Sequence, residues 1–171
     1  MNHFYRTLPA PLVGTLLAAC AATPVALDPG AGLRPSATVQ ARGVQVYECR
    51  IGGTPAAGAW AFVAPEADLF DATGRRIGSH GAGPTWTAAD GSRIVGQVVA
   101  RHEVQGAIPW LLLRTRSAGG PGTWAEVVAI QRIHTEGGLA PTSTAQACDT
   151  PRIGQRVRVP YRADYRLFAA T

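Results

Sequence analysis

Short apolar runs separated by glycine- and proline-containing turns follow one another along most of this chain. Several runs, such as residues 44–51 and 93–99, alternate apolar and polar side chains, which is the period of a strand with one buried face. Asp90-Gly91 precedes one such run and is a preferred pair for a hairpin turn. The best helical candidate, residues 65–70, is one turn long at most. The sequence therefore predicts an all-β, single-domain β-sandwich or barrel of about eight to ten short, mainly antiparallel strands.

Residues 108–114 are apolar on both faces, which is typical of a central buried strand. The proline in this run is expected at the start of the strand, where its missing N–H costs no ladder hydrogen bond. Trp60 and Trp110 lie inside apolar runs and are expected in the core. Trp86 and Trp124 adjoin glycine- and proline-containing loops, so they are either core residues or a face on which a ligand stacks.

The N-terminus is typical of a bacterial lipoprotein signal. Arg6 supplies positive charge, residues 12–19 form an apolar stretch, and small residues precede Cys20. The apolar stretch is far shorter than the roughly 20 residues that a membrane-spanning helix requires. We expect export of the chain and attachment of lipid to Cys20. The alternatives are ordinary secretory cleavage after a small residue near Ala19 to Ala22, and a chain that stays in the cytoplasm.

This signal divides the chain into three parts. Residues 1–19 are expected to be the signal peptide, residues 20–37 a lipid-anchored flexible tether rich in Ala, Pro and Gly, and residues 38–171 the β domain. The expected location is the periplasm or outer envelope, with the lipid holding the protein on a membrane. Soluble secretion is the alternative location.

Lipid on one cysteine leaves Cys49 and Cys148 as a pair. The oxidising environment outside the cytoplasm permits a disulfide between them, and two buried free thiols are the alternative. The sequence has no Cys-x-x-Cys motif and no cluster of cysteines with histidines, so a redox or metal role for these thiols is not favoured.

The formal net charge is +5, and arginine supplies all 16 of the basic side chains counted in it, because the chain has no lysine. The densest basic zone comprises Arg152, Arg156, Arg158, Arg162 and Arg166. Part of this zone alternates arginine with valine, which favours a solvated sheet face over a nucleic-acid-binding surface. We therefore expect no nucleic-acid partner, although such a face can attract anionic lipid or polysaccharide weakly.

Several motifs occur along the chain in an order that is typical of one family: Pro65-Glu66-Ala67-x-Leu69-x-Asp71, Gly78-x-His80-x-x-Gly83-Pro84-x-Trp86, Asp90-Gly91-Ser92, Ile108-Pro109-Trp110-Leu111, Ile130-Gln131-Arg132-x-x-Thr135-x-Gly137-Gly138-x-Ala140-Pro141 and Tyr161-x-Ala163-Asp164-Tyr165. Over residues 40–168 the chain resembles the family known as domain of unknown function 3455, which comprises secreted bacterial and fungal proteins. The resemblance implies an exported single domain with cysteines near Cys49 and Cys148. It implies no catalytic residues, because no activity is established for the family.

Some fungal relatives carry a dehydrogenase-like label, so the glycine-rich residues 78–84 are a candidate nucleotide loop. They do not match Gly-x-Gly-x-x-Gly, and a strand rather than a helix is expected after them. A phosphate-binding loop of that kind needs the N-terminus of a helix behind it. No nicotinamide cofactor, and no other cofactor, is therefore expected.

The polar residues between His80 and Ser92 are the best local candidates for catalysis, with His80 and Asp90 as the weak nominees. A nucleophilic serine is expected in a sharp Gly-x-Ser-x-Gly turn, which the residues around Ser92 do not form. Ordinary turn chemistry accounts for Asp90-Gly91-Ser92 without any catalytic role.

A metal site is the other catalytic possibility, and its candidate ligands are His80, His102 and His134, with Glu103 and Glu136 beside the last two. Three imidazoles suit zinc. Because neither His-x-His nor His-Glu-x-x-His spacing is present, no metal site is predicted.

The sequence favours a non-catalytic ligand-binding or structural β module of the cell envelope. A glycan or a small hydrophobic–polar molecule is the expected ligand, at a site formed by His80, Trp86 and Trp124. The alternative is a hydrolase or metal-dependent enzyme with a pocket around His80 and Asp90. The expected membrane contact is made through the N-terminal lipid.

Overall fold

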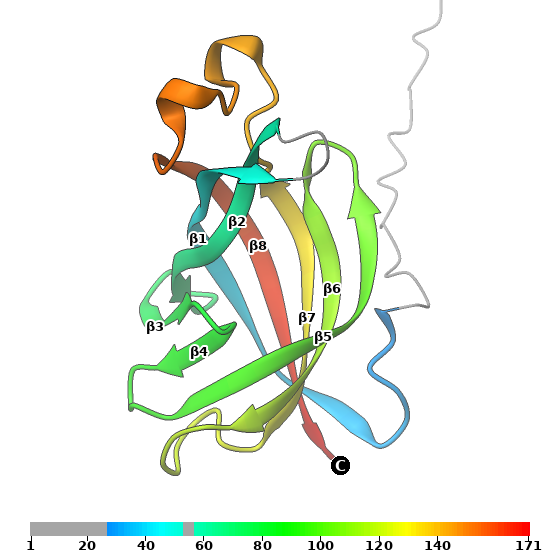
Figure 1. Ribbon diagram of the computed structural model, residues 1–171. Coiled ribbons are helices and arrows are strands. Elements are labelled where there is room, and N and C mark those ends of the chain that lie inside the picture. Colours follow the sequence, from blue (N-terminus) through cyan, green and yellow to red (C-terminus); the bar gives the residue numbers. More distant parts are fainter. Residues whose placement is uncertain (1–26, 53–56) are drawn as a thin grey trace, which may run out of the picture.

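The computed structural model describes residues 27–52 and 57–171, which form one closed barrel of antiparallel strands (Figure 1). Each strand pairs with the next, and the last pairs with the first, which confirms the all-β prediction. The strands are β1 (Leu33–Gly52), β2 (Ala57–Phe70), β3 (Arg76–Gly81), β4 (Thr85–Ala88), β5 (Arg93–Val104), β6 (Ala107–Ser117), β7 (Val127–Gly137) and β8 (Arg156–Ala170). Two short 3₁₀ turns, η2 (Thr144–Gln146) and η3 (Thr150–Arg152), lie between β7 and β8. Across the described ranges, no helix has the length and hydropathy needed to cross a membrane.

The barrel begins earlier than the sequence indicates. Residues 33–37 were expected in the tether, but they belong to β1, where Leu33 pairs with Ala170 at the end of β8. These residues lack apolar alternation because most of them face solvent, so only backbone pairing makes them a strand. Before β1, Leu27 is fully buried and its carbonyl accepts a hydrogen bond of 2.6 Å from Gln131 on β7. Residues 1–26, with the signal and Cys20, lie outside the described residues.

The helical candidate at residues 65–70 is part of β2. Pro65 and Leu69 are buried while Glu66 and Asp68 are exposed, which is the two-residue period of a strand. The predicted hairpin at Asp90-Gly91 is confirmed, since it joins the paired strands β4 and β5.

One end of the barrel is filled by a core that includes two tryptophans. Trp86 and Trp124 are 1% and 3% exposed and pack with aliphatic side chains from most of the strands. Glycines make room for both indoles. A Cβ atom on Gly96 would lie 2.9 Å from Trp86, and one on Gly78 would lie 2.6 Å from Trp124. Further along the same strands the core borders a cavity, and Trp86, Leu113 and Tyr165 contribute to both.

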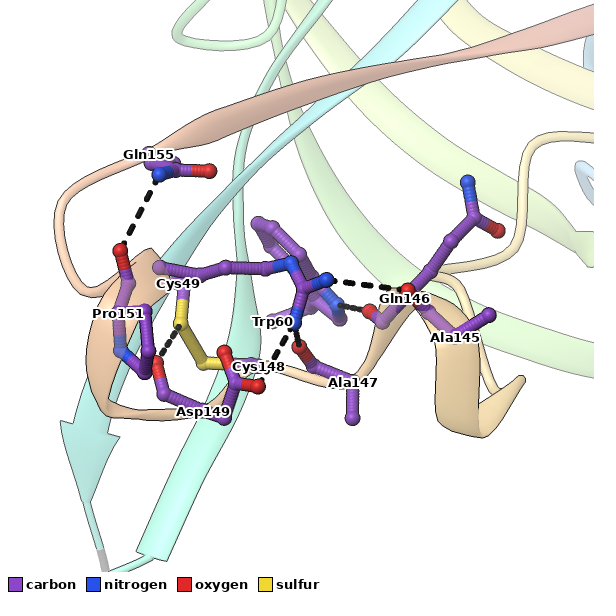
Figure 2. Close-up of polar contacts among 10 residues, drawn as sticks. Cys49, Trp60, Ala145, Gln146, Ala147, Cys148, Asp149, Pro151 and Gln155 are labelled. Carbon is purple, nitrogen blue, oxygen red and sulfur yellow. Dashed lines mark hydrogen bonds and ion pairs between the residues drawn. A yellow bond between two sulfur atoms is a disulfide. The ribbon is translucent and has the colours of Figure 1, made fainter.

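A disulfide between Cys49 and Cys148 fastens the connection that carries η2 and η3 to β1, which confirms the predicted pairing. The two Cα atoms are 5.3 Å apart. Figure 2 shows the neighbouring contacts, among them the Trp60 indole N–H donating to the carbonyl of Gln146 at 2.9 Å. Backbone hydrogen bonds of 2.9 Å from Cys49 to Gln155, and from Gly154 back to Cys49, hold the same connection.

Removing this disulfide is expected to destabilise the barrel. The bond joins cysteines 99 residues apart. In the chain-entropy treatment, closing such a loop contributes about 4 to 5 kcal/mol by constraining the unfolded chain. Urea denaturation of the variant C49S/C148S should give a free energy of unfolding that is lower by this amount. Reduction of the disulfide in the unaltered protein should lower it by the same amount. Equal midpoints for oxidised protein, reduced protein and variant would contradict this expectation.

Candidate functional site

The hollow end of the barrel contains a cavity of about 670 Å³, to which all eight strands contribute lining residues. This volume lies within the range of about 300–1,000 Å³ that is usual for small-molecule sites. The walls are mainly apolar and include Phe62, Val63, Val98, Ile108, Leu111 and Leu113. The side chains of Phe62 and Val98 are about half exposed, so they mark the rim, whereas Leu113 is buried at depth.

His80 on β3 lies at the deep end of the cavity and is 4% exposed. Its ring stacks on Trp86 of β4, which is its direct neighbour in the strand register, with centroids 4.3 Å apart. Nδ1 lies 2.8 Å from the carbonyl oxygen of Thr85. Because a carbonyl only accepts, Nδ1 donates, and Nε2 of the neutral ring is an acceptor.

The protonation state of His80 follows from its burial. Burial lowers the pKa of His80 to about 4, the charge of Arg132 acts in the same direction, and the hydrogen bond to Thr85 opposes them. The imidazole is therefore uncharged at neutral pH and adds a polar but neutral group to the cavity.

Arg132 on β7 brings a positive charge into the cavity. Its backbone lies between Leu111 of β6 and Tyr165 of β8 in the sheet register. Nε and Nη2 donate to the carbonyl of Pro109 at 3.1 and 2.8 Å. All 11 acidic residues of the chain lie within the described ranges, and none of them forms an ion pair with Arg132.

Three buried donors that line the cavity have no hydrogen-bond partner among the described residues: Gln45 Nε2, Trp86 Nε1 and the hydroxyl of Tyr165. Gln45 is 3% exposed and Tyr165 is 1% exposed. Leaving a buried polar group without a partner destabilises the folded protein by about 1–3 kcal/mol. Such a group is therefore a candidate contact for a ligand or ordered water. The deep end of the cavity is thus apolar around its sides and rich in unused donors.

Of the predicted ligand-binding residues, His80 and Trp86 lie together in this cavity, whereas Trp124 does not. Trp124 belongs to the core at the filled end and lines a separate hollow with Asp90. The prediction of one pocket around His80 and Asp90 is therefore wrong: β4 separates the two positions along the chain, and they line different cavities.

Asp90 in the β4–β5 turn links this turn to the segment that precedes Trp124. Its carboxylate accepts hydrogen bonds from Ser92 and from Thr123, through the backbone N–H and the hydroxyl of each residue, at 2.7 to 2.9 Å. The Ser92 hydroxyl in turn accepts from the backbone N–H of Trp124 at 3.2 Å. Hydrogen bonding, above all from the Ser92 side chain, holds the pKa of Asp90 well below its ordinary value. These contacts position Trp124 in the core.

The histidines that could have formed a metal site lie in different places. His102 and His134 flank Trp110, with ring centroids 6.2 and 5.5 Å from it, whereas His80 lies in the cavity. Nδ1 of His134 lies 2.9 Å from the carboxylate of Asp164. Within the described part of the chain, no three histidine, cysteine or acidic side chains are grouped so that they could hold a metal ion.

Gln45, Arg132 and Tyr165 were not predicted as site residues. Gln45 and Arg132 are polar residues on strand faces whose other members, such as Tyr47 and Ile130, are buried. A polar residue on an otherwise inward-facing row is the sequence signal that could have identified them.

The family described as Protein of unknown function (DUF3455) matches residues 29–169. The chain belongs to this family. The match covers nearly the whole DUF3455 barrel, from just before β1 into the last residues of β8, and so confirms the resemblance seen in the motifs. Comparisons with curated proteins and with solved structures gave no match. The family description assigns no activity. The cavity is the structural feature that bears most directly on function.

Protonation of His80 is expected to make the stability of the barrel depend on pH. In the unfolded chain this histidine takes a proton below its ordinary pKa of 6.5, whereas the buried ring resists protonation down to a pKa of about 4. Stability is therefore full at pH 7 and falls as the pH drops through this window, by about 2 kcal/mol at pH 5.

Urea denaturation of the unaltered protein, H80Q and H102Q at pH 7 and pH 5 measures this effect. H80Q should lose most of the difference between the two pH values, and the surface variant H102Q should retain it. A difference that is the same in all three proteins would contradict the assignment to His80.

Proposed function

We propose that this DUF3455 barrel is a binding module for a small amphiphilic molecule, which it takes into the cavity at its hollow end. The observation that carries the proposal is the combination of mainly apolar walls with a few buried, unpartnered polar groups at the deep end. That combination is typical of sites that bury the apolar part of a ligand and orient it through a few polar contacts. An apolar tail also covers the half-exposed side chains at the rim, such as Phe62.

The wall composition favours an amphiphile over a glycan. A sugar ring requires an aromatic face beside several polar partners, whereas aliphatic side chains such as Val98, Leu111 and Leu113 form much of this wall. Trp86 contributes to the cavity, but its indole is 1% exposed and stacks on His80. It supports the deep end and does not provide an open stacking platform.

The cavity also favours binding over hydrolysis. A histidine base acts on a serine, cysteine or threonine nucleophile, or is oriented by a carboxylate. None of these residue types is among the described residues that line the cavity. The acceptor nitrogen of His80 supports a role in holding a ligand hydroxyl or a water molecule.

We propose further that the module is exported and attached to a membrane through lipid on Cys20. The supporting observations are the lipoprotein-type sequence before Cys20 and a disulfide of the kind that persists outside the cytoplasm. An anchored barrel would lie close to a lipid surface, which is a source of apolar molecules.

A bulky side chain at the rim of the cavity is expected to block ligand binding. Val98 lines the cavity and Val99 does not, yet the two side chains are about equally exposed, which makes them a matched pair. The uncharged fluorophore N-phenyl-1-naphthylamine should bind the unaltered protein saturably. V98W should weaken this binding by about tenfold, equivalent to about 1.4 kcal/mol, because the indole occupies the mouth. V99W should leave it unchanged. Absence of saturable binding, or equal effects of the two variants, would overturn the proposal.

The anchor is tested by the mass of the mature protein isolated from bacterial membranes. A chain that begins at Cys20 and carries the mass of attached acyl chains is expected, and C20S should leave the membrane fraction. An unmodified Cys20 in the membrane-derived protein would refute the anchor.

A further inference from the structure

The charge of Arg132 has no acidic partner among the described residues. One carbonyl, that of Pro109, accepts from Nε and Nη2, but a single carbonyl cannot satisfy five N–H donors or neutralise a cation. Arg132 is partly buried, so its charge loses part of its contact with water without gaining a partner of opposite charge. The other arginine of the cavity, Arg101, lies at the rim and pairs with Glu103 at 2.7 Å. Arg132 is therefore the uncompensated charge among the described lining residues.

This charge acts on the polar groups at the deep end of the cavity. Burial raises the pKa of Tyr47 and of Tyr165, and the charge of Arg132 opposes the rise in both. Arg132 also favours the neutral form of His80, after the larger effect of burial. Since these groups are uncharged at neutral pH, they do not neutralise the positive charge of Arg132.

The unpartnered groups that line the cavity with Arg132 are mainly donors. The Trp86 indole N–H can only donate, the Gln45 amide nitrogen donates, and the Tyr165 hydroxyl can donate. A set of donors around one cation is complementary to an anion that carries several acceptor lone pairs. Water alone would satisfy the donors but would leave the charge unmatched.

We propose that the amphiphile bound by this barrel carries a single carboxylate, which pairs with Arg132 at the deep end while the apolar tail extends along Leu111 to the rim at Val98. A carboxylate matches the planar guanidinium with two parallel hydrogen bonds and balances one charge with one charge. A phosphate monoester carries up to two negative charges, and a single arginine would leave one unmatched. This inference rests on the proposed function, because it names the ligand class for the same cavity.

Competition against N-phenyl-1-naphthylamine at pH 7.5 tests the head group with the tail held constant. Dodecanoate, dodecan-1-ol and dodecyl phosphate share a twelve-carbon tail and differ at the head. On the unaltered protein, dodecanoate should bind at least about tenfold more tightly than dodecan-1-ol, the smallest effect expected of hydrogen bonds to a charged group. It should also bind more tightly than dodecyl phosphate.

Two variants assign this preference to a residue. R132Q keeps a donor for the Pro109 carbonyl but removes the charge, so it should bind dodecanoate and dodecan-1-ol about equally while retaining the naphthylamine. R116Q is the matched control, because Arg116 is an exposed arginine of β6 that does not line the cavity, and it should keep the preference of the unaltered protein.

The possible outcomes separate the two proposals. Equal binding of dodecanoate and dodecan-1-ol to the unaltered protein overturns the carboxylate inference and leaves the binding function standing. Tighter binding of dodecyl phosphate overturns it as well. A preference that survives in R132Q refutes the role of Arg132. Failure of the naphthylamine to bind at all overturns both proposals. The comparison of ligands on the unaltered protein decides the head group even if R132Q does not fold.

Discussion

Closure of the sheet by the pairing of β1 with β8 is the constraint on which the rest of the structure depends. The register runs from Leu33 opposite Ala170 to Glu48 opposite Arg156, nearly the full length of both strands. It closes the sheet into a ring and gives it an inside, although the short strands β3 and β4 cover only part of the edges of β2 and β5. It also joins the two ends of the described chain, since Thr171 donates to Gly32 across 139 residues. Contacts so distant in sequence form late and slowly, because a long loop must first be closed.

The interior created by this closure is used in two ways. At one end, indole rings and aliphatic side chains pack across the barrel and supply the core. At the other end, the strands are held apart around a cavity, and Cys49 and Trp60 attach the connection between β7 and β8 near the strand ends that carry Tyr47 and Phe62. The packed core and the cavity thus occupy neighbouring lengths of the same strands, and residues such as Trp86 and Leu113 belong to both. A rigid packed end supports a site whose polar groups remain without protein partners.

The sequence predicts the local features of this architecture well. Alternation identifies most strands, Asp90-Gly91 identifies a hairpin, and the count of cysteines identifies the disulfide. Local spacing also brings His80 and Trp86 together, because a tight connection between β3 and β4 makes them direct neighbours in the register.

The features that the sequence could not predict depend on long-range pairing. Alternation does not show which strands are partners, so it could not distinguish a ring from a sandwich. Arg132 looks like any arginine in a strand until β6 and β8 close around it. For Asp90 the sequence left a turn role and a catalytic role open, and for Trp124 a place in the core or in a ligand site. The hydrogen bonds of Thr123 and Ser92 identify the turn role and the core position.

The glycines beneath the indoles determine more than packing. A methyl group on Gly96 would meet the Trp86 ring, which also forms the deep end of the cavity. Because the indole ring system is rigid, it would have to shift as a unit. The shift would change the depth of the cavity. Under the proposed binding function, the backbone at Gly96 on β5 would limit the length of the ligand, whereas Arg132 on β7 would meet its head group. Under this proposal, selection for length and selection for charge lie on separate strands, so that a substitution would alter one without the other.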